Sequence, residues 1–89
     1  MDKHVRILHL EDDDNDAELV RSVLESGDLD IEIVRVDARR EFESALACSG
    51  FDLIIADYSL PVFDGVSALA IARKDCPEVP YIFVSGNMG

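Results

Sequence analysis

Residues 51–61 read FDLIIADYSLP, and this stretch decides the fold. Its centre, residues 53–56, is an unbroken apolar run, which is typical of a strand that is buried on both faces of a parallel sheet. The run stops at Asp57, so a carboxylate stands where the strand ends. In open α/β sheets ligands bind outside the carboxyl ends of the strands, and Asp57 is therefore a candidate functional residue.

Three further segments have the composition of strands. Residues 5–10 and 31–36 precede the central run, and residues 81–84 follow it after Pro80. Amphipathic stretches separate the four segments, which gives the order βαβαβαβ. This alternation predicts an α/β fold with a parallel sheet, helices on both faces and right-handed crossovers. No repeat or linker divides the chain, so residues 1–89 are expected to form one domain.

Helices are predicted between the strands from the spacing of apolar residues. The first begins near Asp14 or Asn15, either of which can cap it, and ends at Gly27. Asp37 is the expected cap of the second, and the third ends near Lys74. The apolar residues of the three helices are Ala17, Val20 and Leu24 with Leu19 and Val23 beside them, then Phe42, Ala45 and Leu46, then Val66, Leu69 and Ala70.

The charge balance restricts the partners of this domain. The chain has 19 acidic and 8 basic residues, for a formal net charge of −11. Such a field repels nucleic acid and anionic membranes and attracts cations. Cys48 and Cys76 form no metal or redox motif, which favours two free thiols in a reduced compartment. No apolar run approaches the length of a membrane span, and a cytoplasmic location is expected.

Acidic and hydroxyl side chains follow three of the predicted strands. Glu11 and Asp12 follow the first, Asp57 the third and Ser85 the fourth. Taken singly, such residues are more often solvated helix-end charges or turn residues. Their coincidence at one sheet edge favours a shared site, and because crowded carboxylates resist ionisation, a divalent cation would stabilise them. Oxygen ligands of this kind suit Mg²⁺, with room beside it for a phosphate.

Four motifs together resemble the receiver domain of bacterial response regulators. They are ILHLEDD at residues 7–13, FDLIIADYSLP at residues 51–61, VFDG at residues 62–65 and PYIFVSG at residues 80–86. Their order and spacing make the resemblance specific, and it runs from about Val5 to the end of the chain. It implies a flavodoxin-like, doubly wound parallel sheet with strand order 2-1-3-4.

The resemblance also implies a role for each site residue. Asp57 would be the nucleophile that becomes an aspartyl phosphate, with a sensor histidine kinase or phosphotransfer domain as donor. Asp12 would ligate Mg²⁺, and Glu11 would hold it through water. The backbone carbonyl of Ser59 would be a further ligand, and the hydroxyl of Ser85 would contact a phosphoryl oxygen. The module would accept a phosphoryl group and would not itself be an enzyme.

The chain departs from the receiver pattern after the fourth strand. Receivers have five strands and five helices, and neither the lysine nor the aromatic residue of the fifth strand has a counterpart here; Lys74 stands in the third helix instead. We therefore expect an incomplete receiver domain with impaired phosphoryl chemistry. The fourth strand is expected to be an open edge through which the chain self-associates.

Two other functions compete with a phosphoacceptor. A Mg²⁺-dependent phosphatase with an aspartyl nucleophile needs a second carboxylate two residues after it, and that position is Ser59. A structural or interaction module that has lost phosphorylation is disfavoured because Glu11, Asp12, Asp57 and Ser85 are all present. The missing lysine leaves this alternative open.

Overall fold

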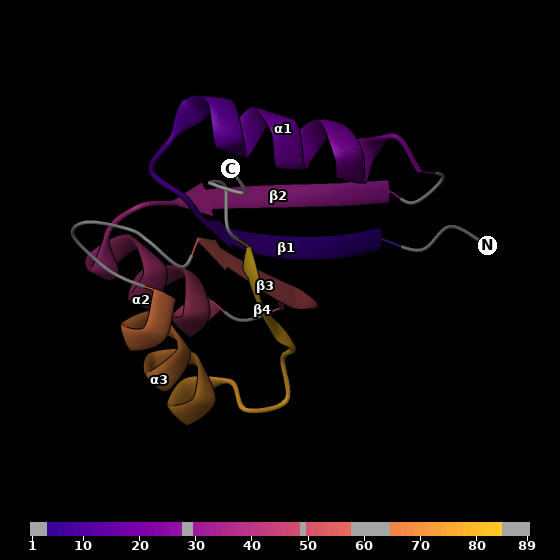
Figure 1. Ribbon diagram of the computed structural model, residues 1–89. Helices are drawn as coiled ribbons and strands as arrows, with labels where there is room; N and C mark the ends of the chain where they lie inside the picture. The colour runs from indigo at the N-terminus through magenta and orange to yellow at the C-terminus, as the bar shows by residue number, and fades with distance from the viewer. Residues whose placement is uncertain (1–3, 28–29, 49, 58–64, 85–89) are drawn as a thin grey trace.

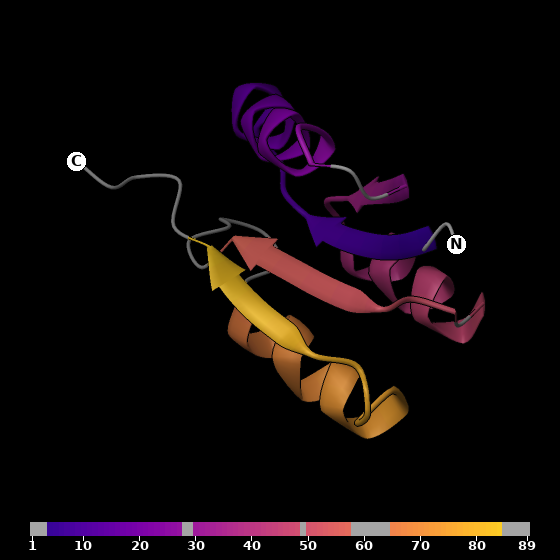
Figure 2. The same cartoon turned by 90° about the vertical axis from the view of Figure 1, so that its right-hand side faces the viewer.

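Four parallel strands form one sheet in the order β2-β1-β3-β4, as expected from the sequence. The computed structural model describes residues 4–27, 30–48, 50–57 and 65–84. The elements in chain order are β1 (His4–Leu10), α1 (Asp14–Glu25), β2 (Asp30–Val36), α2 (Arg39–Cys48), β3 (Leu53–Asp57), α3 (Gly65–Asp75) and β4 (Tyr81–Val84). Helix α1 lies on one face of the sheet, and α2 and α3 cover the other (Figures 1 and 2).

The hydrophobic core lies between the sheet and the pair α2–α3. Alternate strand residues such as Leu8 and Leu10 of β1 and Ile54 and Ala56 of β3 join it, because successive side chains of a strand point to opposite faces. Ile55, on the other face of β3, is also buried. The central apolar run is thus buried on both faces, as predicted.

The α1 side of the sheet is more open. Helix α1 has no fully buried residue, and Leu19 and Val23 are each 64% exposed. Its cap is Asp13, one residue before Asp14: the Asp13 side chain accepts a hydrogen bond from the Asp16 amide at 3.0 Å. An Asp one residue earlier fits because the chain leaves β1 in an extended conformation that the N-cap position requires.

Helix α3 packs through small residues. Its buried positions are Gly65, Ala68 and Ala72, whereas Val66, an expected apolar residue of this helix, is 54% exposed. Small side chains let the helix backbone approach the sheet closely. The helix therefore buries its small residues and leaves the larger Val66 exposed. No helix within the described ranges is long and apolar enough to cross a membrane.

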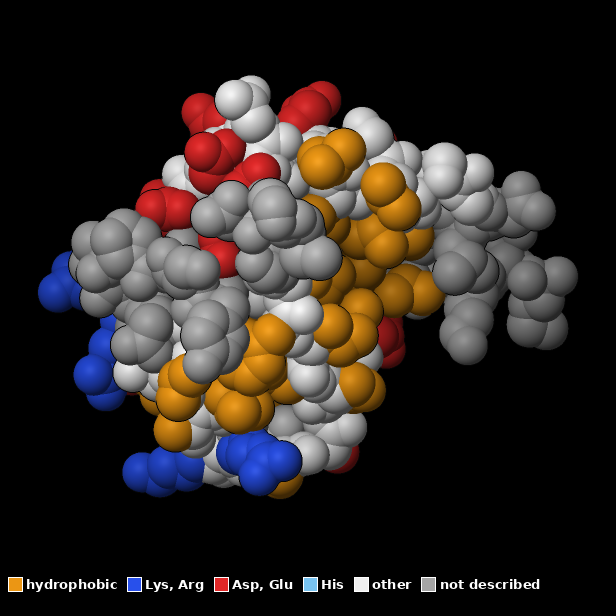
Figure 3. Space-filling model, viewed as in Figure 1, with side chains coloured by type: hydrophobic (Ala, Val, Ile, Leu, Met, Phe, Trp, Pro, Cys, Tyr) orange, Lys and Arg blue, Asp and Glu red, His pale blue; other side chains and the backbone are white. Residues whose placement is uncertain are grey.

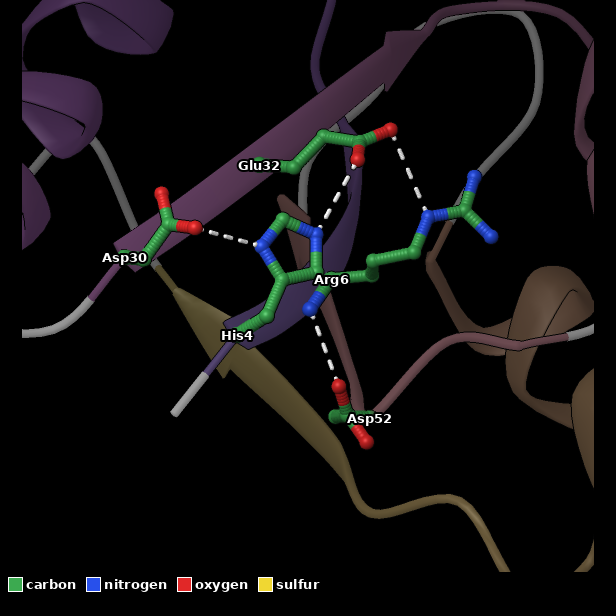
Figure 4. Close-up of polar contacts among 5 residues, drawn as sticks. All are labelled: His4, Arg6, Asp30, Glu32 and Asp52. Atoms are coloured by element: carbon green, nitrogen blue, oxygen red, sulfur yellow. Dashed lines mark hydrogen bonds and ion pairs between the residues drawn. The ribbon is translucent and has the colours of Figure 1, made fainter. Parts of the chain in front are cut away.

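A polar cluster lies at the amino ends of β1 and β2 (Figure 4). The His4 ring contacts Asp30 at 2.9 Å through Nδ1 and Glu32 at 3.2 Å through Nε2. Arg6 donates from Nε to Glu32 at 3.3 Å and from its backbone amide to Asp52 at 2.9 Å. These exposed contacts join β2, β1 and the start of β3 at the end of the sheet opposite Asp57.

The two histidines of the chain are expected to titrate on opposite sides of the ordinary value of 6.5. Hydrogen bonds that the His4 ring donates to the Asp30 and Glu32 carboxylates raise the pKa of His4, whereas burial and then the Arg35 charge lower the pKa of His9. A raised pKa means that the His4 contacts stabilise the fold below pH 6.5 and lose this effect as the pH rises through the folded-state value. NMR titration of both rings, without added metal, measures this.

The variant Asp30→Asn tests the cause of the His4 shift. It should lower the His4 midpoint and leave that of His9 in place, because Asp30 lies at the other end of the sheet. Equal midpoints for the two rings in the unmodified chain would contradict the expectation.

Candidate functional site

The carboxyl ends of β1 and β3 bring three carboxylates together. Glu11 and Asp12 follow β1 directly, and Asp57 is the last residue of β3. These strands are neighbours in the sheet, and one carboxylate oxygen from each of the three residues lies within 4.8 Å of the other two. The sequence prediction that these residues converge is confirmed for the described part of the site. Figure 3 shows acidic side chains gathered on the side of the molecule where α1 begins.

Glu11 is the most unusual member of this group. It is only 3% exposed, and one of its carboxylate oxygens accepts a hydrogen bond from the Asp13 amide at 3.2 Å. Burial raises the pKa of Glu11 to about 7; the Asp13 amide opposes this, while the charge of Asp57 adds to it. The arrangement therefore holds more negative charge than it tolerates at neutral pH, as three converging carboxylates do without a counter-ion.

The start of α3 is packed against the backbone of Asp57. A Cβ atom placed on Gly65 would lie 2.8 Å from the Asp57 carbonyl oxygen and 2.8 Å from Cε1 of Phe83. The hydroxyl of Tyr81 donates to the Gly65 carbonyl at 2.6 Å, and its ring meets that of Phe83 edge to face. Gly65 is thus required for close approach, and two aromatic residues of β4 fix this helix start beside the site.

The three converging side chains fit a hard divalent cation. Mg²⁺ prefers carboxylate, carbonyl and water oxygens, and Glu11, Asp12 and Asp57 supply carboxylates from one sheet edge. Two other predicted site residues, Ser59 and Ser85, lie outside the described residues. Asp37, which directly follows β2, is not a member of the cluster. It was expected to cap α2, but Ala38 directly precedes that helix, and its carbonyl accepts the Phe42 amide at 3.0 Å.

Sequence reasoning missed two residues beside the site. His9 lies within the predicted strand of residues 5–10, yet it is 2% exposed, and the charges of Arg35 and Asp57 act on its ring. Arg35 contacts both Glu11 and Asp14. Only the pairing of His9 with Arg35 across β1 and β2 brings them together, and this register is not visible in either segment alone.

Comparison with known families and proteins agrees with this geometry. The model of the response regulator receiver domain family matches residues 7–88. Transcription factor SKN7 of Chaetomium thermophilum is 32% identical over 87 residues, which are 98% of this chain and 11% of that protein. Transcription factor prr1 of Schizosaccharomyces pombe is 32% identical over 83 residues, which are 93% of this chain and 15% of that protein. The chain thus spans a small part of these relatives.

Solved structures share the fold. The receiver domain of sensor histidine kinase PA1611 from Pseudomonas aeruginosa, which has a magnesium ion coordinated in its active site cleft, matches with TM-score 0.80 and 26% identity over 96% of this chain and 70% of that one. A sensor protein from Polaromonas sp. JS666 matches with TM-score 0.79 and 29% identity over 93% and 66%. The complex of histidine kinase ThkA with response regulator TrrA contains a chain of the same fold, with TM-score 0.70 and 24% identity over 96% and 72%.

Proposed function

Because this chain belongs to the response regulator receiver domain family, we propose that it is the phosphoacceptor module of a two-component phosphorelay. In this proposal Asp57 takes a phosphoryl group from a sensor histidine kinase or a phosphotransfer domain. The observation that carries it is the convergence of Glu11, Asp12 and Asp57 within 4.8 Å at the carboxyl edge of the sheet. The PA1611 receiver domain coordinates magnesium in its own active site cleft, which supports the same ion here.

The proposed reaction needs little from the protein beyond position and charge. An oxygen of the Asp57 carboxylate forms a bond to phosphorus while the phosphorus–nitrogen bond of a phosphohistidine breaks. The departing imidazole nitrogen keeps the electron pair and takes a proton from water. Asp57 is half-buried at a strand end, so its carboxylate is held by a rigid element and still reaches a donor.

The neighbouring residues hold the charge that the reaction gathers. Mg²⁺, when bound, supplies positive charge that offsets the carboxylates and the phosphoryl oxygens. Glu11 and Asp12 would hold it together with Asp57, and the resemblance adds the Ser59 carbonyl as a ligand and the Ser85 hydroxyl as a phosphoryl contact. The chain is the acceptor in this scheme and turns over no substrate of its own.

The test is to incubate the full chain with Mg²⁺ and acetyl phosphate and to measure the intact mass, with a parallel NMR sample containing beryllofluoride. We expect a phosphoryl adduct that disappears in Asp57→Asn, because no other side chain in the cluster replaces the strand-end nucleophile. Asp37→Asn is the matched control, since Asp37 directly follows β2 at the same sheet edge and lies outside the cluster.

The outcome separates this proposal from its alternative. An adduct that persists in Asp57→Asn would reject Asp57 as the acceptor. A folded chain that binds Mg²⁺ and forms no adduct would favour a phosphorylation-incompetent module that acts through binding alone.

The net charge of the chain and the edge of the sheet at β4 indicate which partners it can have. A net charge of −11 disfavours direct contact with nucleic acid or an anionic membrane and suits a cytoplasmic signalling domain. Within the described residues β4 pairs with β3 on one side, and its Ile82 and Phe83 are 48% and 37% exposed. Self-association through β4 is therefore proposed, and light scattering that shows a monomer at all concentrations would reject it.

A further inference from the structure

The guanidinium of Arg35 lies against the acidic loop that joins β1 to α1. Arg35 is on β2 and pairs in register with His9 of β1. Its Nε donates to the backbone carbonyl of Glu11 at 3.0 Å, and its Nη1 contacts the Asp14 carboxylate at 2.7 Å. One side chain thus holds both the first residue of the loop and the first residue of α1.

The peptide groups at Glu11 are held from both directions by β2. The Glu11 amide donates to the carbonyl of Val36 at 2.9 Å, and the Glu11 carbonyl accepts from Arg35. The backbone that carries the buried carboxyl of Glu11 is therefore fixed to the neighbouring strand. Asp12 follows the held carbonyl directly, so its direction depends on the same contact.

We propose that Arg35 is a positioning residue that holds the loop of residues 11–14 so that Glu11 and Asp12 share one divalent cation with Asp57. The inference rests on the proposed function, because it requires that cation. The contact with the Glu11 carbonyl carries the role more than the ion pair does: the Asp14 side chain is 92% exposed, and exposed ion pairs contribute little. The planar fork of arginine can make both contacts at once, which an ammonium group does less well.

Removal of the Arg35 charge separates this role from a purely electrostatic one. A positive charge near a cation site repels the cation, so its loss should strengthen Mg²⁺ binding if charge alone mattered. If Arg35 positions the ligands, its loss should weaken binding, since partners that orient metal ligands typically contribute about 10–100-fold in affinity. The two roles therefore predict changes of opposite sign.

The experiment measures the Mg²⁺ dissociation constant of the full chain by calorimetry, well below the melting temperature, for Arg35→Met and Arg21→Met. Arg21 lines the same surface hollow as Arg35 but pairs with Glu25 along α1, so its loss removes the same charge without touching the loop. We expect about ten-fold weaker binding for Arg35→Met, and unchanged or slightly tighter binding for Arg21→Met. Arg35→Lys, which keeps the charge without the fork, should lie between Arg35→Met and the unmodified chain.

Each result bears on the inference. Unchanged or tighter Mg²⁺ binding in Arg35→Met overturns it, even if that variant melts at a lower temperature, because a merely structural residue would change melting and not affinity. If Arg35→Met does not fold, unweakened binding in Arg35→Lys overturns it. If the unmodified chain does not bind Mg²⁺, or if Asp57→Asn still binds it, the proposed site is overturned as well. If binding depends on Asp57 but not on Arg35, this inference alone is overturned.

Discussion

Replacing Phe42 with alanine is expected to lower the free energy of unfolding by about 3–5 kcal/mol. Phe42 is fully buried on α2, and it is among the largest fully buried side chains of the described core. It packs in the cluster that joins α2 and α3 to β1 and β3. Truncation would remove its buried apolar surface and leave a cavity that a small core cannot close. Domains of this size have about 5–15 kcal/mol in total, so a large part of the stability would be lost.

Denaturant titration followed by circular dichroism measures this loss, with Val23→Ala as the matched control. Val23 is 64% exposed on α1, and its truncation should change stability by no more than about 0.5 kcal/mol. Equal losses in the two variants would contradict the expectation that the buried Phe42 contributes more to stability than the exposed Val23.

The fold was predictable because its strands carry local signals. The unbroken apolar run of residues 53–56 indicates a strand buried on both faces, and Ile54, Ile55 and Ala56 are all buried. The alternation of such segments with amphipathic stretches was enough for the α/β class. The strand order came from the resemblance to receivers, since the order of parallel strands depends on packing between segments far apart in sequence.

Helix faces were predicted less well than strands. The spacing of Val66, Leu69 and Ala70 says only that a helix has apolar residues, and the buried residues of α3 are smaller neighbours. The reason is that the distance between α3 and the sheet determines which face of the helix is buried. The close packing of Gly65 on the Asp57 backbone sets this distance. Such a constraint comes from the assembled sheet and has no signature within the helix itself.

The sequence predicted the carboxylates of the candidate site, but it did not predict the contacts that hold them in place. The positions of Glu11, Asp12 and Asp57 directly after strands one and three predicted a shared site, and these residues do converge. The burial of Glu11 and the contacts of Arg35 with residues 11 and 14 were not predicted, because both depend on the register between β1 and β2. A basic residue within a strand looks like any solvent-facing position until its neighbour across the sheet is known.

Mg²⁺ is expected to raise the stability of the unmodified chain strongly. A ligand that binds only the folded state adds about 2.7 kcal/mol when its concentration is 100 times the dissociation constant. For a domain of this size, each kcal/mol corresponds to about 4–8 °C in melting temperature. Thermal melting with and without Mg²⁺ at constant ionic strength measures the shift, and Ca²⁺-free buffers keep the comparison to one cation.

Asp57→Asn should raise the melting temperature without Mg²⁺ and reduce the increase that Mg²⁺ produces. Without metal the variant should melt higher than the unmodified chain at pH 8, because it removes a charge that raises the pKa of the buried Glu11. With Mg²⁺ it should gain little, since one of three carboxylate ligands is gone. Asp37→Asn also removes one negative charge at this sheet edge, and it should keep the full response to Mg²⁺.

The pH dependence gives the sharpest form of this expectation. Glu11 has a pKa near 7 against an ordinary value of 4.5, so its ionised form is disfavoured in the fold and metal-free stability should fall as the pH rises from 4.5 through 7. A cation favours the ionised carboxylate, and the stabilisation by Mg²⁺ should therefore be larger at pH 8 than at pH 6. Glu11→Gln should abolish this difference between the two pH values. A Mg²⁺ effect that is equal at both would mean that Glu11 takes no part in holding the ion, and that Asp12 and Asp57 bind it without Glu11.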